Sequence, residues 1–162
     1  MDFRAEDYFR AAGERISEAR EVYAHGRYAL AMYCSGLAVE CLLRAFRWLH
    51  DRSFHGRHDL RELLRASRLL SINEAAMLAD GDTQEQIIAA ERRLSIAMNE
   101  VIILWHNNMR FASESRLKSY LNRLGRLRRL KGDGVKKIAR DLLTAATDVV
   151  NHGEALWMYA TK

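Results

Sequence analysis

The sequence predicts an all-α fold, an up-and-down helical bundle of four main helices with short additional helices. The chain has 162 residues with no proline and only nine glycines, a composition that suits helices better than strands and tight turns. Apolar residues recur at three- and four-residue steps along most of its length, which is the helical period. A chain of this length can bury one core, so residues 1–162 are expected to form a single domain.

The first two predicted helices occupy the N-terminal third. Residues 3–24 place their apolar side chains on one face, and His25-Gly26 ends that helix. Residues 27–51 are apolar on nearly every face, so this second helix should be the central one. Glu40 lies in its middle, and a buried carboxylate needs a partner. It either reaches the rim of the bundle, bonds a neighbouring helix or serves a site.

The remaining predicted helices follow a loop that contains Gly56. A cap signal at Asp82 or Thr83 favours one long helix, and the turn signal at 131–134 separates the last two. Their expected ranges are a helix from about Asp59, a short one over 73–79, the long one over 84–105, and a basic C-terminal helical pair within about 113–152, closed by Asn151-His152-Gly153. Beyond it, Trp157 and Tyr159 either dock on another surface or belong to a frayed end.

The charge is strongly asymmetric along the chain. Residues 116–140 hold ten basic residues and one acidic residue, a net +9 within a chain whose total is +5. Such a segment fits a polyanion or an acidic protein, although a solvated helix face is the commonest explanation of a charge run. The residues expected to contact nucleic acid are Arg123, Arg126, Arg128, Arg129, Lys131, Lys136 and Lys137.

Metal, disulfide and membrane chemistry are not expected. Cys34 and Cys41 would lie about 10 Å apart on one helix, too far for a disulfide, so both should be buried thiols. His50, His55 and His58 have no obvious fourth ligand, so no metal or other cofactor is predicted. The N-terminus lacks a signal peptide's apolar segment, and charges interrupt the apolar stretches. A cytoplasmic protein is therefore expected.

Three short motifs follow one another along the chain. They are AVECLLRA at 38–45 in the central helix, GRHDLRELL at 56–64, and MRFASE at 109–114 after the long helix. Over residues 5–115 they resemble the HEPN family, the higher-eukaryote and prokaryote nucleotide-binding domains. This chain departs from the family pattern by Arg44 in place of lysine, by an inserted Arg57, and by Phe111 and Ala112 in place of tyrosine and proline.

The resemblance implies a helical bundle that is often a homodimer, with metal-independent endoribonuclease activity in many members. Other members are non-catalytic modules, including partners of nucleotidyltransferases. Active members look alike in having an arginine followed a few residues later by a histidine, near the start of a late helix. Arg20 to His25 and Arg44 to His50 have that order, but they lie on other helices. The expected place holds the reverse order, His106-Asn107-Asn108-Met109-Arg110.

A site is therefore predicted at this segment. If the long helix continues, His106 and Arg110 share one face and converge on one phosphate. His106 would serve as general base or acid towards a ribose 2′-hydroxyl, while Arg110 would stabilise the phosphate charge. Asn107 would add a hydrogen-bond donor. Glu40 would orient the arginine or the histidine.

Other interpretations stay open. His106 and the asparagines could simply be a helix end in solvent, with Arg110 pairing with Glu40. From another class, a non-catalytic dimeric module could dock an acidic protein partner, a nucleotidyltransferase or an antitoxin, through its basic segment. Nucleotide binding is a third option, for which the chain has no glycine-rich phosphate loop.

Overall fold

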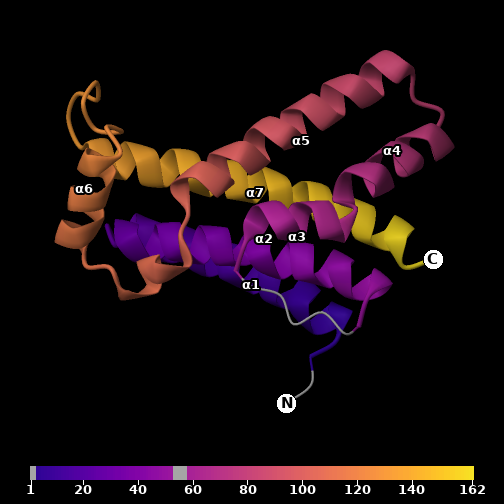
Figure 1. Ribbon diagram of the computed structural model, residues 1–162, viewed down its shortest axis with the longest axis horizontal. Helices are drawn as coiled ribbons and strands as arrows, with labels where there is room; N and C mark the ends of the chain where they lie inside the picture. Colours follow the sequence, from indigo (N-terminus) through magenta and orange to yellow (C-terminus); the bar gives the residue numbers. More distant parts are fainter. Residues whose placement is uncertain (1–2, 53–57) are drawn as a thin grey trace.

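The computed structural model describes residues 3–52 and 58–162, and every regular element in these ranges is a helix. The all-α prediction is confirmed. In chain order the elements are α1 (Ala5–Ala24), α2 (Tyr28–His50), α3 (Leu60–Ser67), α4 (Leu69–Ala79), α5 (Gln84–Leu104), the 3₁₀ helix η1 (Asn107–Phe111), α6 (Glu114–Arg123) and α7 (Gly134–Ala160). The four long helices α1, α2, α5 and α7 make the bundle (Figure 1).

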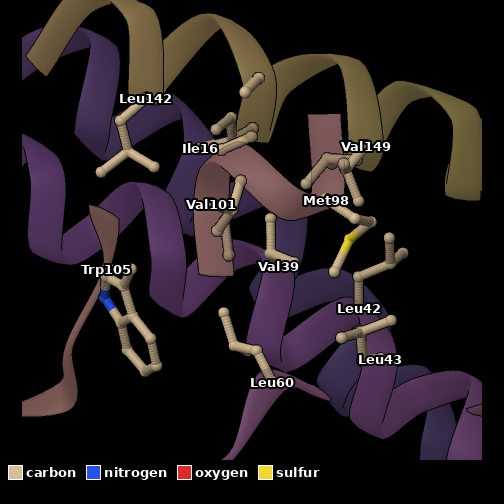
Figure 2. Close-up of a cluster of buried hydrophobic side chains, with 14 of the residues drawn as sticks. Ile16, Val39, Leu42, Leu43, Leu60, Met98, Val101, Trp105, Leu142 and Val149 are labelled. Atoms are coloured by element: carbon tan, nitrogen blue, oxygen red, sulfur yellow. The ribbon is translucent and has the colours of Figure 1, made fainter. Parts of the chain in front are cut away.

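α2 is the central helix, as its sequence predicts. It packs against α1, α7, α3 and η1, and Figure 1 shows α1, α2 and α7 running alongside one another while α5 crosses at an angle. Met32, Leu42 and Phe46 of α2 are completely buried. The shared core also takes Met98 and Val101 from α5 (Figure 2). The centre of the bundle is therefore apolar, and Glu40 lies within it.

By length and composition α2 could also cross a membrane, which differs from the expectation drawn from its charges. Its most apolar window has a mean hydropathy of 1.4, but 78% of that window is buried inside the bundle. A core helix passes the same test. Cys34 is buried on this helix and Cys41 is partly buried, and both are free thiols. Burial raises the pKa of Cys41 to about 11.

Two helix starts follow from caps that the sequence contains. The carboxylate of Asp59 accepts hydrogen bonds from the backbone N–H groups of Arg61 and Glu62 at the start of α3. Thr83 and Gln86 form a reciprocal capping box at the start of α5. α4 begins at Leu69 and so is longer than the predicted 73–79, because Arg68 at φ 56° ends α3 and starts the next helix at once.

The predicted end of the last helix at residues 151–153 is wrong, because α7 continues to Ala160. Gly153 permits this continuation, since a Cβ there would lie 2.5 Å from Cδ2 of Leu42. Trp157, one turn further on, stacks on Phe9 with ring centroids 4.4 Å apart. It also meets Phe46 edge-on at 5.5 Å. The C-terminal turns of α7 are thus held by packing against α1 and α2, which outweighs the local turn signal.

The first helix of the predicted basic pair is also shorter than expected. α6 ends at Arg123, and Gly125 at φ 71° turns the chain away from the helical path. Leu124 and Leu130 are 43% and 38% exposed. Residues 124–133 therefore form a chain of turns between α6 and α7. They carry four of the ten basic residues of segment 116–140, namely Arg126, Arg128, Arg129 and Lys131.

Candidate functional site

Trp105 explains why α5 stops where it does. The residue has extended backbone angles, φ −89° and ψ 143°, and its indole N–H donates to the carbonyl of Tyr33 at 3.1 Å. A Cβ on Gly36 would lie 2.0 Å from Cδ1 of Trp105, so only glycine admits the ring against α2. The aromatic residue thus anchors the chain to the central helix as it passes from α5 towards α6 (Figure 1).

His106 follows this anchor and begins a different kind of helix. Its backbone is extended, and its Nδ1 accepts the backbone N–H of Asn108 at 3.1 Å, which caps η1. The long helix therefore ends before His106, in agreement with its expected range of 84–105. The condition that it continues through Arg110 is not met, so His106 and Arg110 do not share the face of one α-helix. Because a backbone N–H can only donate, Nδ1 of His106 carries no proton in this arrangement, and its proton is on Nε2.

Glu40 has its partners, and they are not Arg110. Its carboxylate is 2% exposed and accepts from Nε of Arg44 at 2.8 Å. Nδ1 of His58 lies 2.8 Å and 2.9 Å from its two oxygens. A carboxylate beside the Arg44 guanidinium accepts here, so Nδ1 of His58 donates, and in the neutral form of the ring Nε2 carries the lone pair.

His58 and His106 line the same cleft, which we name the histidine cleft. It lies between the start of α3 and the segment after α5, and its volume is about 430 Å³. The ring of His58 is 48% exposed, although the carboxylate that orients it is buried. The lining residues are His58, Asp59, Leu60, Arg61, Ile102, Trp105, His106, Asn107 and Asn108. The imidazoles of His58 and His106 thus face one space that is open to water.

A second cleft, which we name the α6 cleft, adjoins the first. It has a volume of about 230 Å³ and lies between η1 and α6. His106 and Asn108 line both clefts. The other lining residues of the α6 cleft are Met109, Ala112, Arg116, Leu117, Tyr120 and Arg123.

Arg110 lines neither cleft. Its guanidinium lies 4.6 Å from the centroid of the Phe111 ring, and both side chains are exposed. Burial raises the pKa of the Tyr33 hydroxyl, and the charge of Arg110 partly opposes that rise, which places Arg110 near the α2 surface at Tyr33. Of the four predicted catalytic residues, the structure therefore brings His106 and Asn107 to the histidine cleft, and Glu40 reaches it through His58.

The predicted nucleic-acid-binding residues are divided between the α6 cleft and the turns after it. Arg123 lines the cleft. Lys137 is partly buried and donates to the carbonyl of Lys131, while the other members of the set are exposed. The carboxylate of Asp133 caps α7 through the N–H of Lys136. The basic surface thus begins beside the candidate site.

Sequence patterns did not predict a role for His58, which was considered only as a metal ligand. The signal that identifies it is its place directly before the helix-capping Asp59, opposite a buried glutamate that needs a partner. Within the described residues no group of His, Cys, Asp and Glu side chains could hold a metal. His55, Gly56 and Arg57 lie outside those residues.

A comparison with models of protein families matches this chain to one of them. The family is described as HEPN domain, and the match covers residues 5–101. The match includes α1, α2, α3 and α4 and ends within α5. No curated protein and no solved structure matches the chain.

Proposed function

Since this chain belongs to the HEPN domain family, which points to an RNA-related or nucleotide-binding function, we propose that it binds RNA and cleaves it without metal in the histidine cleft. The observation that carries the proposal is the orientation of the two imidazoles that line this cleft. Glu40 fixes His58 with Nε2 as a proton acceptor, and the N–H of Asn108 fixes His106 with Nε2 as a proton donor.

The chemistry is an attack of a ribose 2′-hydroxyl on the adjacent phosphorus. Nε2 of His58 takes the hydroxyl proton as general base, and the O2′–P bond forms while the P–O5′ bond breaks. The departing 5′-oxygen takes a proton from water in the cleft. The products are a 2′,3′-cyclic phosphate and a 5′-hydroxyl, and His58 afterwards returns its proton to water.

His106 serves as a hydrogen-bond donor in this scheme. Its Nε2–H is suited to a phosphoryl oxygen that gains charge as the phosphorus becomes five-coordinate. The side-chain amide of Asn107 and the guanidinium of Arg61 line the same cleft and add further donors. Arg110 lines neither cleft in this structure, so a phosphate clamp there would act on RNA bound outside the histidine cleft.

The exposed basic residues after α6 are suited to the RNA backbone. Arg128 and Arg129 are exposed on the turns that lead away from the site. Contacts between arginine and phosphate release counterions, so binding should weaken steeply as salt rises. Arg128→Glu with Arg129→Glu should abolish RNA binding. If this double variant bound RNA as tightly as the unmodified protein, the basic segment would have no part in binding.

The direct test is cleavage of mixed-sequence RNA in the presence of EDTA. We expect fragments that end in a 2′,3′-cyclic phosphate from the unmodified protein and none from His106→Ala or His58→Ala. His25→Ala is the matched control, because His25 is exposed at the end of α1 and bonds only the carbonyl of Glu21 among the contacts described. Cleavage that persists in both cleft variants would contradict the proposal.

A second function is supported by the outer face of α5. Ile88, Ile96 and Ile103 are 55%, 61% and 42% exposed, and their spacing places them on one face of the helix. Exposed apolar stripes mark protein contacts. This face favours a non-catalytic module that pairs with a second copy or with another protein, a nucleotidyltransferase or an antitoxin. An acidic region of such a partner would dock on the exposed basic residues after α6. Stable co-purification with such a protein, without RNA cleavage, would favour this reading over the first.

A further inference from the structure

We propose that the α6 cleft is a subsite for one unpaired nucleotide of a single-stranded RNA, with the base stacked on Tyr120 and the phosphate held by Arg116 and Arg123. This inference rests on the proposed function and gives it a substrate class. The cleft is formed by η1 and α6, which lie beyond the part of the chain that the family match covers.

The size and the floor of the cleft suit one flat ring. Its volume of about 230 Å³ lies below the ~300–1,000 Å³ of pockets that enclose drug-sized ligands. Met109 and Leu117 line it and are 5% and 1% exposed, so its floor is apolar and fixed by the core. A base can bury its face there without leaving a polar group unpaired.

Tyr120 supplies the stacking surface. Its ring is partly buried on α6, and the guanidinium of Arg123 lies 5.7 Å from the ring centroid. Arg123 lies about one turn after Tyr120 on the same helix, so the ring and the cation are presented together. Aromatic and guanidinium planes are the groups on which unpaired bases stack in single-strand-binding proteins.

The charges of the residues that line the α6 cleft favour an anionic ligand. Arg116 and Arg123 both line the cleft and are exposed, and no acidic residue among those that the structure describes lines it. Arginine pairs with phosphate through two parallel N–H groups. Asn108 and His106 add further hydrogen-bonding groups to the lining. A phosphate bound between the arginines would thus lie next to a stacked base.

Continuity with the histidine cleft fixes where this nucleotide lies in the strand. His106 and Asn108 line both spaces, so a strand with a base over Tyr120 can place a neighbouring phosphate beside His106. A base pair would hide the base in a helical stack and keep its face from Tyr120. The subsite therefore selects single-stranded over double-stranded RNA.

The test separates binding from cleavage. A fully 2′-O-methylated oligonucleotide lacks the attacking hydroxyl, so its affinity, measured by fluorescence anisotropy, reports binding without cleavage. Tyr120→Leu should weaken its binding by about 5- to 150-fold, the range expected for loss of one stacked base. The double variant Arg116→Gln with Arg123→Gln should also weaken binding of this oligonucleotide, and its affinity should depend less on the salt concentration. Lys118→Gln is the matched control, since Lys118 is exposed on α6 but does not line the cleft.

An abasic residue locates the stacked base. Placed next to one cleavable ribonucleotide in an otherwise methylated strand, it should lower kcat/KM of the unmodified protein, and Tyr120→Leu should add little to that loss. Unchanged affinity in Tyr120→Leu, with normal cleavage, would overturn the subsite and leave the proposed function standing. If Tyr120→Leu weakened binding as expected but the unmodified protein cleaved no RNA, the subsite would be supported and the ribonuclease function would be overturned. Equal affinity for duplex and single strand would also overturn the subsite.

Discussion

Nδ1 of His58 lies 2.8 Å from Oε1 of Glu40, which joins the start of α3 to the middle of the central helix. The carboxylate is buried and the imidazole is half exposed. The buried charge of Glu40 therefore orients an imidazole that faces the cleft. The same carboxylate holds Arg44. One glutamate therefore serves both the stability of α2 and the orientation of a candidate base.

Replacing the carboxylate by an amide tests both roles. Glu40→Gln keeps the volume but weakens two charge-assisted hydrogen bonds, so the free energy of unfolding should fall by about 1.5–3 kcal/mol. RNA cleavage should fall as well, because the amide can hold His58 with the wrong nitrogen protonated. Urea unfolding measures the first effect. The exposed Glu14→Gln removes an equal charge and should change neither quantity, and an equal loss in both variants would contradict the role of Glu40.

The contact between Gly36 and Trp105 makes a second prediction. Gly36→Ala places a methyl group on top of the indole, so the protein should lose about 1–3 kcal/mol of stability through overpacking. The emission of Trp105 should change as the ring is displaced. Gly13→Ala is the matched control, since its new Cβ would lie 3.6 Å from the nearest atom and a helical alanine is favoured over glycine. If Gly36→Ala were as stable as Gly13→Ala, the indole would not be seated on α2 as described.

The last turns of α7 should contribute to stability. Trp157 is 9% exposed and contacts Phe9 and Phe46, so Trp157→Ala should cost about 3–5 kcal/mol. Tyr159→Ala, two residues later and 39% exposed, should cost far less. Thermal unfolding of the two variants makes the comparison. Similar melting temperatures would mean that the end of α7 is not packed on α1 and α2.

Stability should decrease as the pH falls because of His152. Its Nε2 lies 2.7 Å from Oδ1 of Asn73, and burial, with a smaller effect of Arg93, lowers the pKa of His152 below 6.5. The unfolded chain therefore binds more protons than the folded one, so this stability is full above pH 6.5 and is lost as the pH falls below it.

His50 acts in the same direction, since burial and then Arg68 and Arg47 lower the pKa of its imidazole. The difference between the unmodified protein and His152→Gln isolates the part due to His152. The free energies of unfolding of the unmodified protein and of His152→Gln should differ at pH 7.5 and should approach one another at pH 5. A gap that stays constant over this range would contradict the assignment.

Much of the fold could be predicted from the sequence, because periodicity and caps report local preferences. The limits of α2, the start of α3 near Asp59, and the cap of α5 at Asp82 or Thr83, which proves to be Thr83, are examples. The errors occur where contacts between residues far apart in the sequence determine the structure. Trp157 extends α7 through Gly153 by packing on α1 and α2. The end of α5 near Trp105 was predicted correctly, and the structure supplies its cause, the insertion of the indole beside Gly36.

The candidate site shows the same division. A buried glutamate in an apolar helix signals that a partner exists, but helical spacing alone cannot identify it. His58 lies 18 residues away from Glu40 in sequence, so only the packing of α3 on α2 brings them together. The shared face of His106 and Arg110 depended on a continuation of the long helix, which ends before either residue. His106 itself reaches the cleft for a different reason, its place directly after the anchored Trp105.

The most direct measurement is chemical rescue of His58→Ala. Its cleavage of a strand with a single ribonucleotide would be followed in EDTA, with and without imidazole in solution. If His58 is the general base, the variant should be inactive alone and should regain cleavage with imidazole, while His106→Ala should not be rescued. Full activity of His58→Ala without imidazole, or no cleavage by the unmodified protein, would contradict the assignment of the histidine cleft as a ribonuclease site.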